Sequence, residues 1–394
     1  MKSAFSLLRN RNLLLLGLVS LFTDLSSQMI YPYLPLLLTE LGANKSVIGL
    51  IEGIAEATAA LLKSVSGRLA DRSGRRKGFV LGGYSLSAFA KPALYLAAAW
   101  WQVLAVRFLD RTGKALRNPA RDALIAGSVP AADRGSAFGL HRAMDRIGAL
   151  GGPLLALAVL AAWPGDLRMV FLWSAVPAFI AVALIPFVRE AAAAARQPAA
   201  GPSGTRILLG SRPFRLFLLA NLLFSLGNAS EAFLILKAEE SGVPPLHLPL
   251  LWVMYNAVCV LLAPAMGRLS DRIGRMRVIL ISFAWFSGVY ALFGSADQAW
   301  QIWMLFALYG VYYGLSDGVY RAYLADLAAP ELRASAYGLF STATGLALLP
   351  ASLLMGTLWD QYGSQIAFYA AAGCSAAGML VMWLGVQQGS ETAS

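Results

Sequence analysis

GRLADRSGRRK, from Gly67 to Lys77, returns as GRLSDRIGRMR, from Gly267 to Arg277, after a shift of 200 residues. Each copy lies between two apolar stretches. A second pair of segments, DRGSAFG (133–139) and ELRASAYG (331–338), recurs at nearly the same offset. Two matches at nearly one offset indicate an internal duplication, so we expect the chain to consist of two related units.

Apolar stretches dominate the rest of the chain. The 394 residues are 58% hydrophobic and 13% charged, with a mean hydropathy of +0.62. A stretch of roughly 20 apolar residues can cross about 30 Å of hydrocarbon as a helix. Such stretches lie near residues 13–38, 46–70, 78–100, 101–127, 135–162, 168–188, 213–236, 246–269, 277–295, 299–326, 334–358 and 364–387. The expected fold class is therefore an all-α polytopic membrane protein, with twelve transmembrane helices in two pseudo-symmetric six-helix bundles.

A segment rich in Ala, Pro and Gly, from Arg189 to Arg206, follows the sixth span. We expect it to belong to a cytoplasmic linker, residues 189–212. The linker would join an N-terminal bundle, residues 1–188, to a C-terminal bundle, residues 213–394.

Basic residues gather in every second loop, which gives an orientation. These loops contain Arg9, Arg11, Arg72, Arg75, Arg76, Lys77, Arg134, Arg189, Arg196, Arg206, Arg212, Arg272, Arg275, Arg277 and Arg333. By the positive-inside rule both termini are cytoplasmic, and the expected location is the plasma membrane, the inner membrane of a bacterium. The net charge of +11 therefore arises from short loops, and no nucleic-acid partner is expected.

The repeated loop follows the pattern G-x-L-a-D-r-x-G-r-r, and on it the chain resembles the major facilitator superfamily (MFS) of secondary transporters. The resemblance covers almost the whole chain and points to the proton-coupled drug and metabolite antiporter branch. It implies that the loop latches the two halves in the outward-facing state, a role carried to Asp71, Arg72, Arg75 and, in the second copy, Asp271. The alternative is that these are ordinary loop charges placed by the positive-inside rule.

The fifth span carries a second resemblance. Gly139, Gly148, Gly152 and Pro153 match the spacing G-x8-G-x3-G-P of the family's antiporter motif, which is found mainly in exporters. Glycines permit close helix contact and proline permits a kink, and we expect both at the interface between the halves. Gly148, Gly152 and Pro153 are therefore predicted gating residues.

The fourth span, VRFLDRTGKALRNPARDALIA (106–126), is the most highly charged. Its charges occupy an arc of roughly 140° on a helical wheel; they are Arg107, Asp110, Arg111, Lys114, Arg117, Arg121 and Asp122. A charge at the bilayer centre costs about 2.5 kcal/mol or more, so this face must line protein or a water-filled cavity. Arg111 lies roughly 15 Å from the outer end of the span. We expect Arg111, flanked by Arg107 and Lys114, to bind an anionic group of a solute.

Acidic residues of the first half supply candidates for a coupling proton site. Asp24 lies on the first span, one turn from Gln28, and Glu52 and Glu56 lie four residues apart on the second. Residues four apart share a helix face. We expect Asp24, Glu52 or Glu56 to carry the proton, with Glu231 and Asp317 as the next candidates. We expect Gln28 to contact the solute. The alternative for each acid is a structural ion pair.

The second half offers polar aromatic and amide side chains that can stack on and hydrogen-bond an organic solute. The candidates are Asn228, Tyr255, Asn256, Tyr309, Tyr313 and Asp317. A stripe of tyrosines is also compatible with ordinary helix packing.

The leading hypothesis is a secondary transporter that moves a small organic, anionic or zwitterionic solute by alternating access. We expect proton coupling, export, a monomer in the lipid bilayer, no bound metal and no cofactor other than the proton gradient. The alternative is transport of a metal ion or a metal chelate such as a siderophore, with ligands among Met29, Met144, Met254, Met266, Cys259 and His141. Nucleotide-binding and hydrolase motifs are absent, so neither an ATP-driven pump nor an enzyme is expected.

Overall fold

The computed structural model describes residues 10–130, 133–190, 202–329 and 332–391. Within these ranges the regular structure is helical, without a β-strand. The N-terminal half contains α2 (Arg11–Ile30), η1 (Tyr31–Tyr33), α3 (Leu34–Glu40), α4 (Lys45–Ser73), α5 (Arg76–Ala90), η2 (Lys91–Leu96), α6 (Trp100–Gly127), α7 (Arg134–Ala162), α8 (Arg168–Trp173), α9 (Ala175–Leu184) and η4 (Ile185–Phe187). The C-terminal half contains α10 (Pro202–Gly210), α11 (Arg212–Gly227), α12 (Ala232–Glu240), η5 (Pro245–His247), α13 (Leu248–Ile273), α14 (Arg275–Ser295), α15 (Ala299–Leu327) and α16 (Arg333–Glu391).

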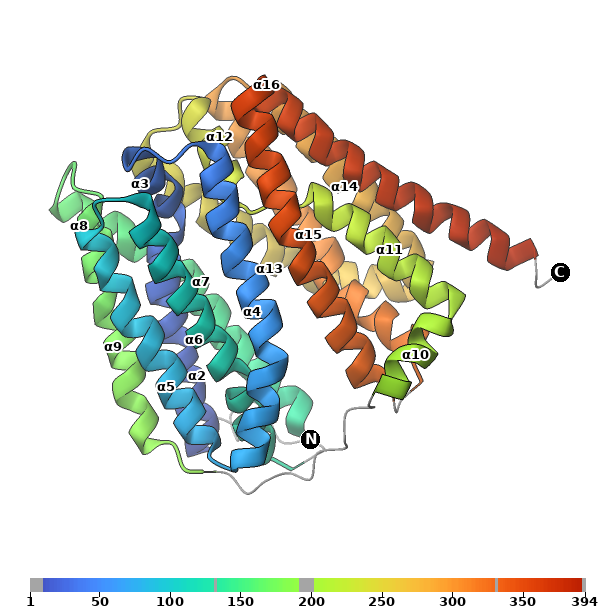
Figure 1. The fold of residues 1–394 in the computed structure, drawn as a ribbon, viewed down its shortest axis with the longest axis horizontal. Coiled ribbons are helices and arrows are strands. Elements are labelled where there is room, and N and C mark those ends of the chain that lie inside the picture. Colours follow the sequence, from blue (N-terminus) through green and yellow to red (C-terminus); the bar gives the residue numbers. More distant parts are fainter. Residues whose placement is uncertain (1–9, 131–132, 191–201, 330–331, 392–394) are drawn as a thin grey trace. The chain divides into compact units, whose positions relative to one another are not determined.

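A helix or a pair of helices occupies each of the twelve predicted spans. Spans one and seven are interrupted midway, at Tyr31–Tyr33 and between Gly227 and Ala232. The last two spans form α16, which bends sharply at Gly363, where φ is 84° (Figure 1). By length and composition, seven described segments are apolar enough to cross a membrane. The segment formed by α6 is not among them because its charged residues lower its hydropathy.

The helices group into two compact units. As far as it is described, unit 1 comprises Met1–Ala43, Ile54–Arg196 and Pro245–Val253, and unit 2 comprises Asn44–Gly53, Gln197–Pro244 and Met254–Ser394. The two units mostly follow the predicted division at residues 189–212, with two exceptions. The start of α4 belongs to unit 2, and the start of α13 belongs to unit 1. The described part of the predicted linker also contains the helix α10.

The start of α4 belongs to unit 2 because small residues and one cap fix it there. A Cβ atom on Gly49 would lie 2.1 Å from the backbone oxygen of Ser352 in α16. The Asp360 carboxylate accepts hydrogen bonds from the backbone nitrogens of Lys45 and Ser46, at 2.9 and 2.7 Å. A carboxylate at these positions satisfies two helix N-terminal donors and complements the helix dipole.

Glycines with positive φ mark the duplication. Every described glycine of this kind belongs to a pair at equivalent positions of the two halves: Gly42 with Gly242, Gly74 with Gly274, and Gly165 with Gly363. Only glycine adopts this backbone conformation without strain. The predicted duplication therefore extends to the turns between helices.

Side-chain hydrogen bonds repeat in the same way. The Gln102 side chain accepts from the backbone nitrogen of Ala98 before α6, and Gln301 accepts from that of Asp297 before α15. Arg134 donates to a backbone oxygen at the end of α6, and Arg333 does so at the end of α15. The same capping contacts thus begin and end the fourth span of each half.

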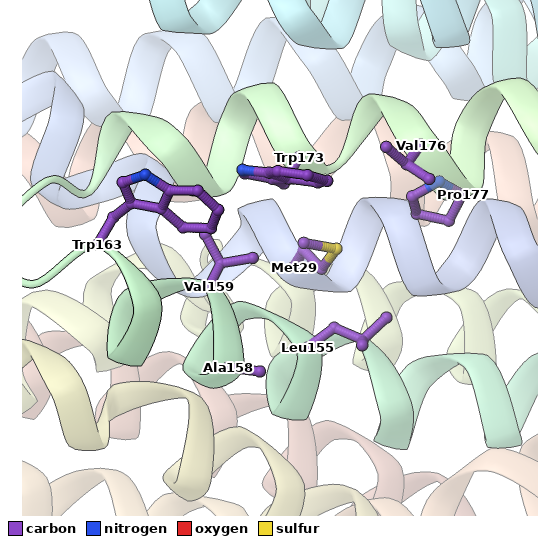
Figure 2. A pocket seen from close by; sticks show the side chains of 8 residues that line it. All are labelled: Met29, Leu155, Ala158, Val159, Trp163, Trp173, Val176 and Pro177. Carbon is purple, nitrogen blue, oxygen red and sulfur yellow. The ribbon is translucent and has the colours of Figure 1, made fainter.

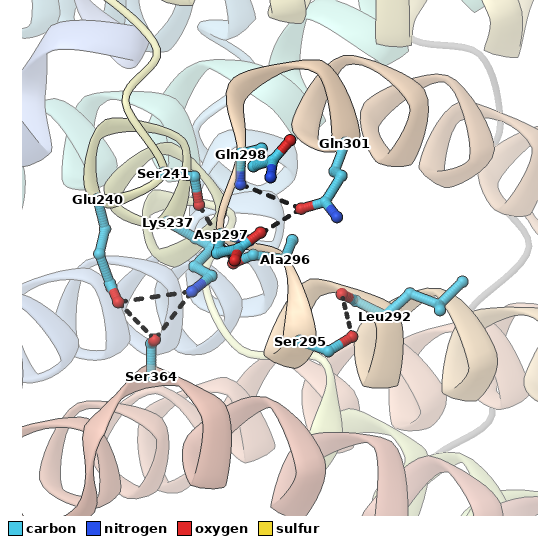
Figure 3. Close-up of polar contacts among 10 residues, drawn as sticks. All are labelled: Lys237, Glu240, Ser241, Leu292, Ser295, Ala296, Asp297, Gln298, Gln301 and Ser364. Atoms are coloured by element: carbon cyan, nitrogen blue, oxygen red, sulfur yellow. Dashed lines mark hydrogen bonds and ion pairs between the residues drawn. The ribbon is translucent and has the colours of Figure 1, made fainter.

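Unit 2 also contains a polar cluster that fixes α12 against the second part of α16. The Lys237 ammonium is buried and lies 3.0 Å from the Ser364 hydroxyl and 3.5 Å from a Glu240 carboxylate oxygen (Figure 3). The Ser364 hydroxyl donates to the same oxygen at 2.8 Å. Each member of this cluster has a partner, as burial of a charged group requires.

An apolar cavity of about 300 Å³ lies in unit 1 between α2, α7, α8 and α9 (Figure 2). It is lined by Met29, Leu155, Ala158, Val159, Trp163, Trp173, Val176 and Pro177. Several of these side chains are exposed, including Leu155, Trp173 and Val176. Since no charged side chain lines the cavity, it does not match the anion site predicted from the sequence.

Candidate solute site

The charged face of α6 is turned into unit 1. Arg107, Arg111 and Arg117 are buried, whereas Phe108 and Leu109 are exposed. The α6 helix can approach α5 closely because a Cβ atom on Gly113 would lie 2.5 Å from the backbone oxygen of Gly83. The sequence pattern of a charged face opposite an apolar one therefore corresponds to an inner and an outer face.

Arg111 is held by an acid from the second span. Its Nη2 atom lies 3.1 Å from Oε1 of Glu56 in α4, and the Arg111 side chain is largely buried while that of Glu56 is 33% exposed. Lys114 is half-buried and interacts electrostatically with the same carboxylate. Arg107 also interacts electrostatically with Glu56, so this carboxylate links all three predicted anion-binding residues.

Asp110 interacts with a lysine of the third span. The Lys91 ammonium is buried at the junction of α5 and η2 and donates to the hydroxyls of Ser26 and Ser27 in α2, at 3.1 and 2.8 Å. Asp110 interacts electrostatically with Lys91 and with its neighbour Arg111. Lys91 and Asp110 thus compensate each other inside the bundle.

Two further arginines of α6 are bound to neighbours. Arg117 donates to the Ser87 hydroxyl at 2.6 Å, and its guanidinium lies 4.5 Å from the ring centroid of Tyr84. Arg121 forms an ion pair with Asp122 at 2.9 Å and donates to Ser20 in α2 at 3.0 Å. These contacts lie at the end of the charged face that is farthest from Arg111. They favour a structural role for Arg117 and Arg121.

Asp24 lies in α2 against the same face. It interacts electrostatically with Lys114, Arg117 and Arg121 of α6, and with Asp145 of α7. Asp145 in turn lies 3.5 Å from Nδ1 of the buried His141. Two carboxylates therefore face each other among the arginines.

The three predicted proton carriers have different surroundings. Asp24 and Glu56 belong to unit 1, but Glu52 belongs to unit 2. Glu52 is buried and accepts a hydrogen bond from the Ser230 hydroxyl at 3.3 Å. Residues four apart on α4 share a face, yet that face passes from one unit to the other between Gly53 and Ile54.

The glycines of the antiporter-like motif bring α7 against α2 of the same unit. A Cβ atom on Gly148 would lie 2.4 Å from the backbone oxygen of Leu21, and one on Gly152 would lie 2.6 Å from that of Leu25. Pro153 is buried beside them, and α7 continues through it. The close contact was expected at the interface between the halves, but the structure places it inside unit 1 because α2 provides the matching backbone surface.

The polar aromatic residues of the second half meet around Glu231. The Tyr313 hydroxyl donates to Oε1 of Glu231 at 2.9 Å, and the Tyr255 hydroxyl lies 3.5 Å from the same atom. The ring of Tyr309 packs against both tyrosines, with centroid distances of 5.3 and 5.4 Å. Tyr309 is fully buried. It therefore supports the other two rings and does not itself present a surface to a solute.

Other predicted residues have separate positions. The Gln28 side chain accepts a hydrogen bond from the Trp252 indole at 2.9 Å in unit 1. Asn256 is buried in α13, and Asn228 is half-buried at the interruption of span seven. The side chains of Asp71 and Asp317 lie outside the described residues. The remaining predicted latch residues are exposed: Arg72, Arg75 and Asp271.

Comparisons with known proteins identify the family. The family model described as Major Facilitator Superfamily matches residues 16–244 and 217–393. A protein of Methanocaldococcus jannaschii, described as an uncharacterised MFS-type transporter, is 33% identical over 381 residues, which are 95% of this chain and 95% of that protein. The chain belongs to the major facilitator superfamily.

Relatives also include the multi-drug resistance efflux pump PmrA of Streptococcus pneumoniae, which is 24% identical over 75% of each chain. A crystal structure of the nucleoside transporter NupG shares the MFS fold, with a TM-score of 0.80 at 15% identity over 95% of this chain and 98% of that chain.

Membership of the MFS confirms three predictions: the family, the fold of twelve spans in two six-helix bundles, and a function that is not enzymatic. The protein is a multi-pass membrane transporter, and transporters of this family bind small-molecule solutes.

Sequence reasoning gave little weight to two residues of the site. Lys91 was one basic residue among several, although a Lys-Pro pair inside an apolar span is a local signal for an interrupted helix with a buried charge. Glu231 was a second-rank proton carrier. Its signal is the sequence GNASE (227–231), in which small and polar residues break span seven.

Proposed function

We propose that this MFS transporter moves a small anionic or zwitterionic organic solute by alternating access, coupled to protons and in the direction of export. The proposal includes a monomer in the plasma membrane, the inner membrane of a bacterium, with both termini cytoplasmic and the proton gradient as the energy source. No further cofactor is needed.

The observation that carries the proposal is the ion pair between Arg111 and Glu56 on the buried basic face of α6. Arg107, Lys114 and Arg117 extend the positive charge on both sides of Arg111. A guanidinium binds carboxylates and phosphates through a planar fork of donors, so a solute anion can replace Glu56 as its partner. Glu56 is also partly exposed, as this exchange requires.

The same pair supports proton coupling. A proton and the Arg111 guanidinium compete for the Glu56 carboxylate. Protonation of Glu56 therefore changes the charge around Arg111 and, with it, the binding of a charged solute. Of the three predicted proton carriers, we propose Glu56 first because it contacts a predicted solute-binding residue, with Asp24 second because it faces the same helix.

The direction of transport rests on two supports. The glycine motif of α7 is found mainly in exporters, and the relatives include a multi-drug resistance efflux pump. The described residues contain no group of three or more His, Cys, Asp or Glu side chains that could hold a metal ion. Transport of a metal ion or a metal chelate stays the alternative.

Glu56→Gln is expected to impair proton coupling while leaving solute exchange largely intact. Glutamine keeps the shape of the side chain but carries no proton to release, so pH-gradient-driven flux should fall about tenfold while solute counterflow stays within about threefold. The solute for this assay is the metabolite whose export depends on the gene in a comparison of cells with and without it. If Glu56→Gln, Asp24→Asn and Glu52→Gln all leave both fluxes intact, the coupling group lies elsewhere.

Asp71→Asn is expected to lower transport roughly tenfold while the protein remains folded and inserted, because the predicted latch loses a charged acceptor but no volume. Flux is compared at matched amounts of protein in the membrane. Normal flux in the variant would return Asp71 to the role of an ordinary loop residue.

A further inference from the structure

The interruption of span seven places an acid in the middle of unit 2. The α11 helix ends at Gly227 and α12 begins at Ala232, so Asn228 to Glu231 are not helical. Non-helical backbone at membrane depth is tolerated only where it is buried in protein or lines a water-filled cavity. In secondary transporters, interrupted helices mark the places where solutes and ions bind. Glu231 therefore lies at a position where a binding site is expected.

Tyrosine side chains surround the Glu231 carboxylate. The hydroxyls of Tyr313 and Tyr255 are directed at the same carboxylate oxygen of Glu231, at 2.9 and 3.5 Å. The two rings meet edge to face, with centroids 5.4 Å apart and an angle of 72° between their planes. Behind them Tyr309 packs against both rings and fixes their orientation. The side chains of Glu231 and Tyr313 are half-buried, so the cluster is not sealed inside unit 2.

This combination has the chemistry of a cation-binding site. A carboxylate supplies a full negative charge, and the faces of aromatic rings attract organic cations through their quadrupoles. The two hydroxyl donors orient the carboxylate, as a pre-organised site requires.

We propose that Glu231, Tyr255 and Tyr313 form a subsite for an organic cation, such as the ammonium group of the solute. The inference rests on the proposed function in one respect: it assigns the cation to a charged group of the transported solute. Glu231 binds the positively charged group directly, and the tyrosines bind its alkyl or aryl substituents.

The test uses purified full-length protein in lipid nanodiscs and two cationic probes, tetraphenylphosphonium and the smaller benzyltrimethylammonium, measured by equilibrium binding. Nanodiscs without protein control for non-specific partition of both probes into lipid. We expect saturable binding of at least one cation to the wild type. Glu231→Gln should weaken it about tenfold or more, whereas Glu231→Asp should stay within about threefold.

A matched control is Glu239→Gln, which removes an exposed acid from the neighbouring helix α12 and should leave binding unchanged. Tyr313→Leu removes a ring without altering any charge and should also weaken binding. It gives an independent test in case Glu231→Gln does not fold. The subsite is refuted if neither cation binds the wild type above the background of nanodiscs without protein. It is equally refuted if Glu231→Gln folds and binds the cation as tightly as the wild type. If Glu231→Gln does not fold, the same result with Tyr313→Leu refutes the subsite.

The outcome is distinguishable from a failure of the proposed function. If cation binding depends on Glu231 but the transported solute carries no anionic group, the subsite stands and the proposed solute class is wrong. If a zwitterion is transported and its flux is unaffected by Glu231→Gln, the proposed function stands and the subsite is wrong.

Discussion

Arg111→Ala is expected to lower transport of the solute at least about 100-fold, while the protein still folds and inserts. The guanidinium is largely buried and forms an ion pair with Glu56. Its removal takes away the partner that the solute anion needs. Truncating one member of a hydrogen-bonded charge pair in a binding site costs roughly 3 kcal/mol, equivalent to about two orders of magnitude in binding. The measurement is export of the gene-dependent metabolite from cells, normalised to the amount of protein in the membrane.

Arg111→Lys tests whether the fork of the guanidinium matters or only its charge. Lysine keeps the charge but cannot bind a carboxylate or phosphate through two parallel hydrogen bonds, so we expect a loss of about tenfold. Lys63→Ala is the matched control, because it removes an exposed positive charge from α4 in the same unit and should leave transport unchanged. Normal transport by Arg111→Lys, together with collapse of the fold in Asp110→Ala, would make the basic face a structural ion-pair network.

Gly148→Ala is expected to destabilise the fold of unit 1. The added methyl group would lie 2.4 Å from the backbone oxygen of Leu21 and 3.0 Å from Cβ of Asp24, so α2 and α7 must move apart along their contact. Overpacking of this kind costs about 1–3 kcal/mol, and close approach through small residues is what holds membrane helices together. We expect a reduced yield in the membrane and a lower midpoint of thermal unfolding.

The control for this variant lies on the same helix and in the same motif. A Cβ atom on Gly139 would meet no atom within 4 Å. Alanine favours the helical conformation over glycine by about 1 kcal/mol, so Gly139→Ala should leave the midpoint unchanged or raise it. Equal midpoints for Gly148→Ala and the wild type would show that the contact between α2 and α7 is looser than the structure indicates.

Periodicity and repetition in the sequence predicted the parts of the fold that depend on local chemistry. The repeated loop at Gly67 and Gly267 revealed the duplication, and the spacing of charges from Arg107 to Asp122 identified the inner face of α6. Both signals arise from rules that act within one helix or one turn.

The parts that were missed depend on tertiary neighbours. Glu52 and Glu56 share a helix face, but no local pattern shows that α4 passes from unit 2 to unit 1 between them. Similarly, a stripe of tyrosines does not reveal that Tyr309 is buried behind Tyr255 and Tyr313, nor that an acid from span seven meets them. Helix packing determines these contacts, and it is set by residues far away in the sequence.

The central claim is that a proton gradient drives an anionic or zwitterionic solute through the site around Arg111. The most direct measurement uses proteoliposomes that contain wild-type protein or Arg111→Ala, incubated with a small-metabolite extract under an imposed pH gradient, acidic inside. Mass spectrometry then identifies the metabolites that accumulate in the vesicles. We predict that one or a few carboxylate- or phosphate-bearing metabolites accumulate with the wild type, that a protonophore abolishes the accumulation, and that Arg111→Ala shows none. Accumulation of metabolites without an anionic group, or equal accumulation with Arg111→Ala, would contradict the account.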